Sequence, residues 1–302
     1  MRKMRKVPAV SIIIPTHNRK EKLMKLLNSI LSSKYPQKKL EVIVVDDAST
    51  DGTYEEIKRR FPAVKVIRNP KELFLANSRN IGIRNASGKY LFLIDDDGLV
   101  TKTTLQRMVN FMEKHPEIGG ANPIILLYST KKVWTIGVKV NMFTTIVSTN
   151  KSIPKGNYVE FLSGHCMIFR KEVLDVIGGF NPLFPLERED LDISIRIKRR
   201  GYRLGICKNA IVYHDIAPSK RARPVNRVRA YFRVRSRILF HMLYGRNVLE
   251  FIVSLLFSLG ISLFDIAKSF LIKDKYLTRN LIKGLLDALT IYLKIRKQSW
   301  RY

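Results

Sequence analysis

Cysteine and acidic residues are both scarce in this chain of 302 residues. Cys166 and Cys207 do not show the spacing of metal ligands, so neither a disulfide framework nor a zinc site is expected. We expect both thiols to be reduced and buried, as in a cytosolic protein. Acidic residues number 25 against 55 lysines and arginines, which gives a formal net charge of +30. This excess favours a polyanionic partner: nucleic acid, an anionic membrane surface or a phosphorylated substrate.

Long apolar runs are missing as well. The N-terminus, MRKMRKVPAVSIIIP, begins like a signal peptide, but its apolar run is short, Pro15 interrupts it and no small-residue cleavage site follows. We interpret it as a basic tail that leads into a strand. The C-terminal apolar run at 248–264 contains Glu250 and is followed by Asp265. It is shorter than the about 20 residues that a membrane-spanning helix needs.

What remains is the composition of a globular protein, with 46% hydrophobic and 26% charged residues. A chain of this length forms one large domain or two modest ones. Its character changes near residue 215, because nine lysines and arginines and no acid occur between Ile216 and Leu249. An amphipathic helix with basic residues is predicted over 281–297. We therefore divide the chain into a first domain, 1–215, and a basic, amphipathic helical region, 216–302.

Short apolar strands alternate with helical patterns in the first domain. Strands are predicted at 9–14, 40–45, 64–67 and 90–94, and helices after residue 20 and at 53–61, 74–86 and 102–114. This alternation predicts right-handed βαβ units and a parallel sheet with helices on both faces. Ligands of such sheets bind beyond the carboxyl ends of the strands. Two acidic clusters follow strands there and should converge on one crevice: Asp46 and Asp47, and Asp95, Asp96 and Asp97.

The aspartate triplet is unfavourable in a confined place unless a cation or hydrogen-bond donors compensate its charges. A solvated turn is the alternative, because DDD and DDAS are also good turn and capping sequences. Their occurrence at two strand ends of one predicted sheet favours a ligand site.

The middle of the chain is less regular. Residues 118–161 are typical of short strands and loops, and 164–180 of a strand followed by a short helix that Gly178 and Gly179 close. The segment 187–202 alternates like a strand, but its i,i+4 apolar pairs, acidic start, basic end and terminal glycine favour a helix.

Six motifs occur in an order that resembles glycosyltransferase family 2, the inverting, nucleotide-sugar-dependent enzymes, and within it the rhamnosyltransferase-like subset. They are SIIIPTHNR, VIVVDDASTDGT, NSRNIGI, LFLIDDD, FLSGHCMIFRKEVLDVIGGF and EREDLDISIRIKRRGYR. The resemblance covers about residues 8–215. It implies an α/β fold of the GT-A (Rossmann-like) type, with a mostly parallel sheet and helices on both faces, plus a C-terminal helical, membrane-associating segment.

The resemblance also implies roles for single residues. Asp95 would face the nucleoside, Asp47 would bond the base, and Asp97 would hold Mn²⁺ or Mg²⁺. His214 lies where related enzymes carry a metal-binding histidine, although a lone histidine is more often structural. The residues expected at the nucleotide sugar are Pro15, Thr16, Arg19, Asp47, Arg79, Asp95 and Asp96.

Asp190 is the expected general base. Inverting transfer needs one carboxylate to take the proton of the acceptor hydroxyl as it attacks the anomeric carbon. The family's E-D-x-D-L-x-x-R element maps onto residues 189–196, and the base is the aspartate of its E-D pair. The alternative is an acidic helix N-terminus that complements the helix dipole, which explains Asp192 and Glu189 but not Asp190. His165 could line the acceptor site.

The implied activity is the transfer of one sugar from a nucleotide-diphosphate sugar to a hydroxyl of a lipid-linked glycan or polyprenyl-type acceptor. A processive polysaccharide synthase is an alternative, but its Q-x-x-R-W element and several spanning helices are missing. A nucleic-acid-binding protein is a second alternative, yet no recognition motif accompanies the charge, so nucleic acid is not an expected partner.

The basic and apolar C-terminal region favours an anionic membrane surface. We therefore expect a cytoplasmic enzyme, peripheral on the inner face of the cell membrane, with a homo-oligomer interface as the alternative.

Overall fold

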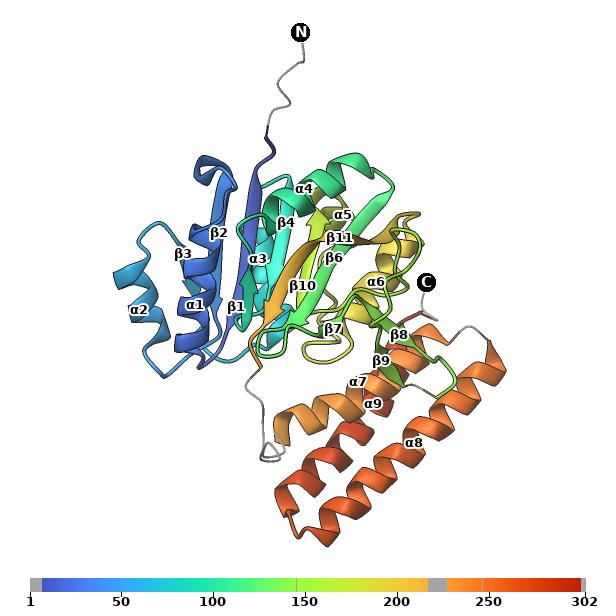
Figure 1. The fold of residues 1–302 in the computed structure, drawn as a ribbon. Coiled ribbons are helices and arrows are strands. Elements are labelled where there is room, and N and C mark those ends of the chain that lie inside the picture. The colour runs from blue at the N-terminus through green and yellow to red at the C-terminus, as the bar shows by residue number, and fades with distance from the viewer. Residues whose placement is uncertain (1–6, 145, 217–226, 246, 300–302) are drawn as a thin grey trace. The chain divides into compact units, whose positions relative to one another are not determined.

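The structure is a computed structural model that describes residues 7–144, 146–216, 227–245 and 247–299 (Figure 1). Its contacts divide the chain into two compact units. The first consists of Met1–Val138, Thr149–Pro182 and Ile193–Pro218, and the second of Lys139–Ser148, Leu183–Asp192 and Ser219–Tyr302. The functional division after residue 215 stays a prediction. The predicted basic tail at 1–6 and part of the basic run after residue 215 lie outside the described residues.

The first unit is built around a nine-stranded sheet with the order β3-β2-β1-β4-β10-β6-β11-β5, and β7 pairs with β6. The strands are β1 (Val10–Thr16), β2 (Leu40–Asp46), β3 (Lys65–Arg68), β4 (Tyr90–Ile94), β5 (Gly98–Val100), β6 (Ile118–Leu127), β7 (Val133–Thr135), β10 (Cys166–Arg170) and β11 (Arg203–His214). The helices are α1 (Lys20–Leu31), α2 (Thr53–Arg60), α3 (Leu75–Arg84), α4 (Thr104–Lys114), α5 (Lys171–Ile177) and α6 (Glu189–Arg199), the last of which begins in the second unit.

The predicted α/β architecture is confirmed, and the parallel pairing holds for β3, β2, β1 and β4. Beyond β4 the sheet is mixed, because β10 runs antiparallel to both β4 and β6, and β5 runs antiparallel to β11. Strands β5 and β11 were not predicted from the sequence. The segment 118–161, expected to hold short strands, begins with the ten-residue buried strand β6.

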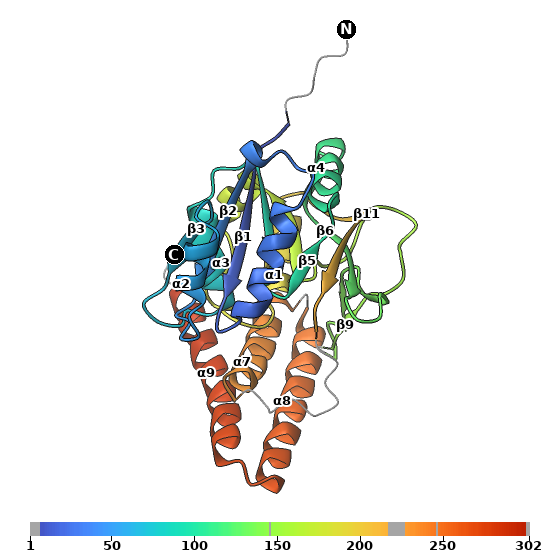
Figure 2. The same cartoon turned by 60° about the vertical axis from the view of Figure 1, so that its left-hand side comes forward.

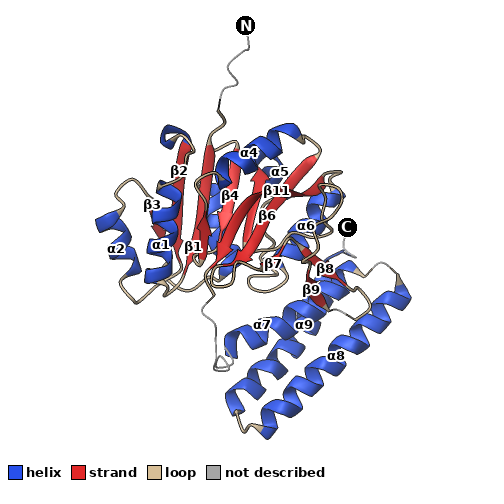
Figure 3. Ribbon diagram, viewed as in Figure 1, coloured by secondary structure: helices blue, strands red, loops and turns tan. Residues whose placement is uncertain are grey.

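Helices cover both faces of this sheet (Figure 3). The alternation of side chains along β1 explains how one strand serves two cores. Ile12 and Ile14 pack in a cluster with residues of α1, α2 and α4, whereas Ile13 packs with residues of α3, α5 and α6. Cys166 and Cys207 are buried free thiols, as expected.

Two predictions for the end of this unit are confirmed. The segment 164–180 forms β10 and then α5, which Gly178 ends in the left-handed conformation at φ +74°. The segment 187–202 forms helix α6, although its alternating apolar residues imitate a strand.

The second unit contains three long helices: α7 (Arg227–Tyr244), α8 (Val248–Leu271) and α9 (Lys275–Ser299). They lie side by side (Figure 2). Apolar side chains of α7 and α9, among them Val234, Ile238 and Leu281, form its core. A two-stranded sheet of β8 (Val138–Val140) and β9 (Val147–Thr149) falls largely in this unit.

Helix α8 corrects one expectation. The apolar run was expected to end at Asp265 and to be too short to cross a membrane. The helix instead continues through Asp265 to Leu271, because one aspartate on a helix surface does not interrupt its backbone hydrogen bonds. With 24 residues, α8 is the one described helix that is long and apolar enough to cross a membrane, by length and composition alone.

The side chains of α8 are distributed in an unusual way. Its buried residues are polar: Glu250, Ser254, Ser258, Ser262 and Ser269. Its exposed residues include large apolar side chains, such as Leu256 at 63% and Phe264 at 68% exposure. A helix of a soluble protein normally turns its apolar stripe inward. The outer face of α8 is therefore suited to an apolar environment rather than to water.

Candidate functional site

The aspartate triplet lies at the carboxyl end of β4, and each of its carboxylates has different partners. Asp95 accepts a hydrogen bond from the fully buried guanidinium of Arg79, with Nη2 2.7 Å from Oδ1. Arg79 also donates to the carbonyl oxygen of Gly164. Burial by itself would raise the pKa of Asp95, but Arg79 and His165 hold it below its ordinary value. Asp95 therefore keeps its charge at the end of the strand.

Asp96 points into the protein, as the strand-end geometry suggests. It is 6% exposed and accepts hydrogen bonds from the hydroxyl of Thr16 at 2.9 Å and from Nη1 of Arg19 at 3.2 Å. Burial raises the pKa of Asp96 to about 7, and the neighbouring carboxylates of Asp95 and Asp97 add to this rise against the effect of Arg19. The triplet thus carries less than three full charges near neutral pH.

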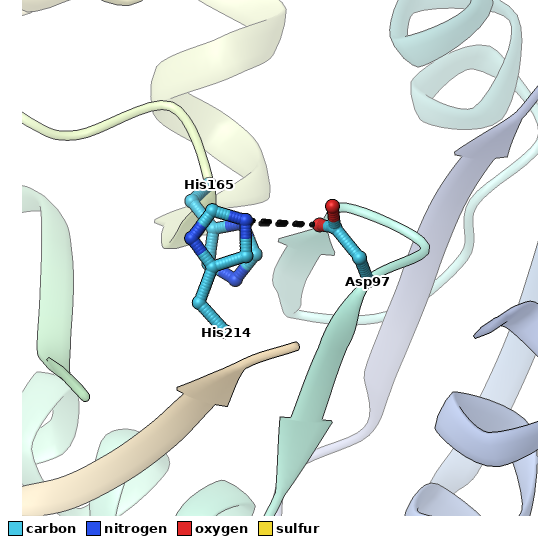
Figure 4. A group of neighbouring side chains, drawn as sticks. All are labelled: Asp97, His165 and His214. Carbon is cyan, nitrogen blue, oxygen red and sulfur yellow. Dashed lines mark ion pairs between the residues drawn. The ribbon is translucent and has the colours of Figure 1, made fainter. Parts of the chain in front are cut away.

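Asp97 faces two histidines (Figure 4). Its Oδ1 lies 3.3 Å from Nε2 of His214 and 3.6 Å from Nδ1 of His165. Its other oxygen, Oδ2, accepts a hydrogen bond from Nη1 of Arg19 at 2.7 Å, and Nζ of Lys22 lies 3.9 Å away. One carboxylate oxygen is therefore paired with a cation of the chain, while the other is directed at the imidazoles.

The pairing of the strands explains why these three side chains meet. Antiparallel pairing of β11 with β5 places His214 opposite Gly98, the residue after Asp97. Pairing of β10 with β4 brings His165 beside Asp95, whose N–H donates to the His165 carbonyl oxygen. Gly98 allows the tight turn between β4 and β5, since a Cβ there would lie 2.7 Å from the side chain of Ile94. Residues from three distant parts of the sequence are thereby joined.

The charges of this group suit a metal ligand set. Burial alone would raise the pKa of Asp97, but the hydrogen bond with His214 and the nearby charges of His165, His214 and Arg19 lower it strongly. Burial lowers the pKa of His214, and this effect outweighs the attraction of Asp97. Asp97 is therefore ionised and His214 neutral at neutral pH, which are the protonation states that metal ligands require.

The residues present fit a divalent metal ion. One carboxylate oxygen and two imidazole nitrogens, from Asp97, His165 and His214, lie within 4.8 Å of one another. Mg²⁺ prefers an octahedral shell of oxygens, whereas imidazole nitrogen suits transition metals, so this donor set favours Mn²⁺ over Mg²⁺. His165 was expected at the acceptor site and not at the metal. Only the pairing of β10 beside β4 could have indicated the assignment to the metal.

The second acidic cluster reaches the same edge of the sheet. The Thr16 carbonyl oxygen accepts a hydrogen bond from the N–H of Asp47, while the Thr16 hydroxyl bonds Asp96. Pro15, just before Thr16 in β1, is buried and pairs with Val45. The two aspartate clusters, predicted to converge, thus lie one strand apart.

Asp47 itself organises a loop. Its Oδ1 accepts hydrogen bonds from Nδ2 of Asn69 and from the N–H of Leu73, and its Oδ2 accepts one from the N–H of Phe74, all at 2.8 Å. Phe74 precedes α3 with φ +67°. Both carboxylate oxygens are therefore used within the chain. This geometry favours an indirect contribution to a base pocket, through the shape of the loop.

Asp190 lies in the first turn of α6, in the part of that helix that belongs to the second unit. Its side chain is partly exposed and lines a cavity of about 320 Å³. Glu189 and Asp192, its acidic neighbours, are 6% and 0% exposed, and Asp192 accepts a hydrogen bond from the hydroxyl of Tyr244. Of the three acids, Asp190 is thus the most exposed one, and it lines a cavity. Asp192, expected only to complement the helix dipole, also ties α6 to α7.

The backbone before α6 is strained. Glu187 and Arg188 have φ values of +66° and +71°, in the left-handed region that residues other than glycine rarely adopt. Strained backbone conformations are common at functional sites, where the packing of the surrounding protein holds them in place. It places Arg188 and Asp190 on the same cavity.

Comparison with known proteins relates this arrangement to a family. The family described as "Glycosyl transferase family 2" matches residues 11–178. The glycosyltransferase AglE of Haloferax volcanii is 29% identical over 217 residues, which cover 70% of this chain and 68% of that protein. An Escherichia coli protein, the UDP-Glc:alpha-D-GlcNAc-diphosphoundecaprenol beta-1,3-glucosyltransferase WfaP, is 27% identical over 194 residues, which cover 64% of this chain and 71% of that one.

A solved structure shares the fold. The mannosyltransferase PcManGT from Pyrobaculum calidifontis, in complex with GDP-Man and Mn²⁺, superimposes with a TM-score of 0.59 at 19% sequence identity. The match covers 94% of this chain and 88% of that one. The predicted GT-A fold is thereby confirmed.

Proposed function

The chain belongs to glycosyltransferase family 2 and is a glycosyltransferase, and from this premise we propose a more specific activity. It is a metal-dependent, inverting enzyme that moves one sugar from a nucleotide-diphosphate sugar to a hydroxyl of a glycan or lipid-linked acceptor. The observation that carries this proposal is the convergence of Asp97, His165 and His214 at the carboxyl edge of the sheet.

Asp97 Oδ1 and the two imidazoles would hold Mn²⁺ or Mg²⁺, with Mn²⁺ favoured by the nitrogen donors. When bound, the metal supplies Lewis-acid stabilisation of the charge on the departing diphosphate. Arg19, which pairs with Asp97 Oδ2, adds a fixed positive charge beside that point.

The remaining residues at this edge bind and orient the donor. Arg79 fixes Asp95 through Oδ1, and Oδ2, which lies 3.6 Å from Nδ1 of His165, is the oxygen that would reach the nucleoside. Asp47 holds the loop 69–74, and this loop, together with Pro15 and Thr16, lines the base pocket. Asp96 contributes indirectly, since it holds Thr16 and Arg19 in place.

Asp190 is the general base of the transfer. Its carboxylate takes the proton of the acceptor hydroxyl while the acceptor oxygen forms a bond to the anomeric carbon. The bond between that carbon and the diphosphate oxygen breaks, and the nucleoside diphosphate leaves with the electron pair. Configuration is inverted in this single displacement, and no covalent enzyme intermediate is formed.

The second unit accounts for the acceptor and the location. The exposed apolar face of α8 would insert into the cytoplasmic leaflet, with its polar face turned toward the protein. Lysines and arginines of this region would be attracted by anionic lipids, at about 1 kcal/mol each. The enzyme would then lie peripherally on the inner face of the membrane. The name of the related E. coli enzyme specifies a diphosphoundecaprenol-linked sugar, which is consistent with a lipid-linked acceptor.

A panel of nucleotide sugars tests the donor half of this proposal. The purified protein is incubated with each donor and Mn²⁺, Mg²⁺ or EDTA, and released nucleoside diphosphate is measured. We expect hydrolysis of one or a few donors with Mn²⁺, slower hydrolysis with Mg²⁺ and none with EDTA. Hydrolysis that EDTA does not change, or no hydrolysis of any common nucleotide sugar, would contradict the proposal.

A further inference from the structure

The cavity beside Asp190 has a cationic lining. Three arginines contribute to it: Arg188, Arg233 and Arg237. The acids of the lining are Glu187 and Asp190, and Glu187 already forms an ion pair with Arg229, whose Nε lies 2.5 Å from its Oε1. The charge that faces the cavity is therefore positive on balance. Burial, reinforced by Arg237, lowers the pKa of Arg188 to about 10, as expected where cations crowd together.

Arg237 is buried in an unusual state. Its side chain is 7% exposed, and its Nη1 has no hydrogen-bond partner among the described residues. A buried guanidinium normally has its N–H groups satisfied, because an unmade hydrogen bond to a charged group is costly. Phosphate oxygens are well matched to the planar fork of arginine. The unpaired Nη1 of Arg237, in a residue that lines a cationic cavity, thus points to an anionic ligand.

An apolar groove adjoins this cavity. A second hollow of about 580 Å³ is lined only by α8 residues, namely Val253, Leu256, Phe257, Gly260, Ile261 and Phe264. Ile261 lines both the cationic cavity and this groove. A ligand that fills both would have an anionic head and a hydrocarbon chain. A nucleotide sugar has no part that matches the groove.

We propose that the cavity binds the phosphate or diphosphate of a lipid-linked acceptor, and that the hydrocarbon chain of this lipid runs along the α8 groove. The assignment rests on the proposed function, because Asp190 in the same cavity is the base assigned to the acceptor hydroxyl. Arg233 and Arg237 bind the anionic group, and Ile261 marks the point where the head ends and the chain begins.

Titration calorimetry of the full chain in dodecyl maltoside tests this assignment. The probes are inorganic pyrophosphate and farnesyl diphosphate, both with EDTA, so that no metal contributes. We expect farnesyl diphosphate to bind at least about tenfold more tightly than pyrophosphate, since its chain occupies the groove. Arg237→Gln and Arg233→Gln should each weaken both probes by about tenfold or more, the size expected for a hydrogen bond to a charged group.

Two further variants distinguish binding of the diphosphate from binding of the hydrocarbon chain of the lipid. Gly260→Leu adds apolar volume at the groove, and its Cβ has room there, because a Cβ at Gly260 would meet nothing within 4 Å. It should abolish the advantage of farnesyl diphosphate and leave pyrophosphate binding unchanged. Arg279→Gln removes an exposed cation of α9 and should change neither affinity. Arg233 is exposed, so Arg233→Gln keeps the test valid even if Arg237→Gln fails to fold.

Three results would overturn the assignment. The first is unchanged affinity for pyrophosphate in both folded arginine variants. The second is an equal loss of nucleoside diphosphate binding with Mn²⁺, which would assign the cavity to the donor. The third is displacement of farnesyl diphosphate by phosphatidylglycerol at equal mole fraction, which would indicate a site for ordinary membrane headgroups. Donor hydrolysis by the same preparations separates failures: hydrolysis without pyrophosphate binding refutes only the cavity assignment, whereas no hydrolysis refutes the proposed function.

Discussion

The carboxylates at the strand ends of the first unit and the arginines of the second unit illustrate two ways of burying charge. Asp95, Asp96 and Asp97 each have a cationic or hydrogen-bonding partner from within the chain. Arg237, at 7% exposure, is buried about as deeply as Asp96, at 6%, yet its Nη1 has no hydrogen-bond partner among the described residues. The carboxylates of the acidic cluster thus have partners within the chain, whereas Nη1 of Arg237 is left for the anionic ligand that we propose. The formal net charge of +30 does not reveal this difference between the two units.

The two units also differ in where their apolar residues lie. In the first unit, the isoleucines of β1 and the leucines and isoleucine of β4 are completely buried. In α8 the serines are buried, and residues such as Leu256 and Phe264 are exposed. Burial of apolar surface stabilises the first unit by itself, whereas α8 would gain the same stabilisation from a lipid surface.

The largest effect should come from the acid of the second unit that faces a cavity. Asp190→Asn keeps the shape of the side chain but removes its basicity, so transfer should fall by about 10²–10⁴-fold while donor binding is retained. Initial rates at saturating acceptor measure this. Asp175→Asn, at an exposed aspartate of α5, should behave as wild type. Near-normal turnover of Asp190→Asn would assign the base to another carboxylate.

The second largest effect should come from a substitution in the acidic cluster. Asp97→Ala removes the oxygen that faces both histidines, and we expect Mn²⁺ affinity to fall about 100-fold or more, beyond the effect of losing an outer partner of a metal ligand. Calorimetric titration with Mn²⁺ and a nucleoside diphosphate measures the change. Undiminished Mn²⁺ binding would show that the metal is held elsewhere.

The two histidines should each contribute less. His165→Ala and His214→Ala should lower Mn²⁺ affinity at least about tenfold, whereas His115→Ala should not change it. Protonation removes an imidazole as a ligand, and the pKa of His214 is lowered in the folded protein. The affinity should therefore be steady from pH 8 down to about 6.5, the ordinary pKa of histidine, and fall below it. Titrations across this range check the profile, and a loss that begins above pH 7 would contradict it.

Substitutions on the outward face of α8 should have a moderate effect on membrane binding. Leu256→Glu with Phe264→Glu places charges on this face, and binding to phosphatidylglycerol liposomes at high salt should weaken about tenfold or more, because charges are expelled from hydrocarbon. High salt screens the lysines and arginines and leaves the apolar contribution. Val176→Glu changes an exposed apolar residue of α5 and serves as the control in sedimentation. If the wild type stayed in the supernatant at low salt, a homo-oligomer interface would explain α8 better.

Asp96 should give the smallest effect, on stability. Burial raises its folded pKa from 3.8 to about 7, so the folded state binds this proton more tightly than the unfolded state, and wild-type stability declines as pH rises through this interval. Asp96→Asn lacks this loss. Its Tm in EDTA should exceed that of the wild type by a few degrees at pH 8, since about 1 kcal/mol shifts Tm by 2–4 °C, and by less at pH 5. If Asp96→Asn raised the Tm more at pH 5 than at pH 8, the predicted direction of the pH dependence would be wrong.

The sequence predicted those elements of the fold that depend on the residues within each segment. The alternation of apolar runs and helical segments indicated β1, β2, β3, β4 and their helices, and the aspartates followed from their place at strand ends. Strand β10, antiparallel to β4, and strand β11, parallel to β6, are positioned by long-range pairing, which a single sequence does not reveal. For that reason His165 was assigned to the acceptor and not to the metal. The full length of α8 was missed because Asp265 resembles a terminator when only the sequence is considered.

The metal site can be tested most directly with crystals grown with Mn²⁺ and a nucleoside diphosphate, measured at the manganese absorption edge. The account predicts one anomalous peak within bonding distance of Oδ1 of Asp97 and of a ring nitrogen of His165 and of His214. Arg19 should remain at Oδ2 of Asp97. A peak at Asp46 and Asp47, or no peak near Asp97 while the nucleotide is bound, would contradict the account.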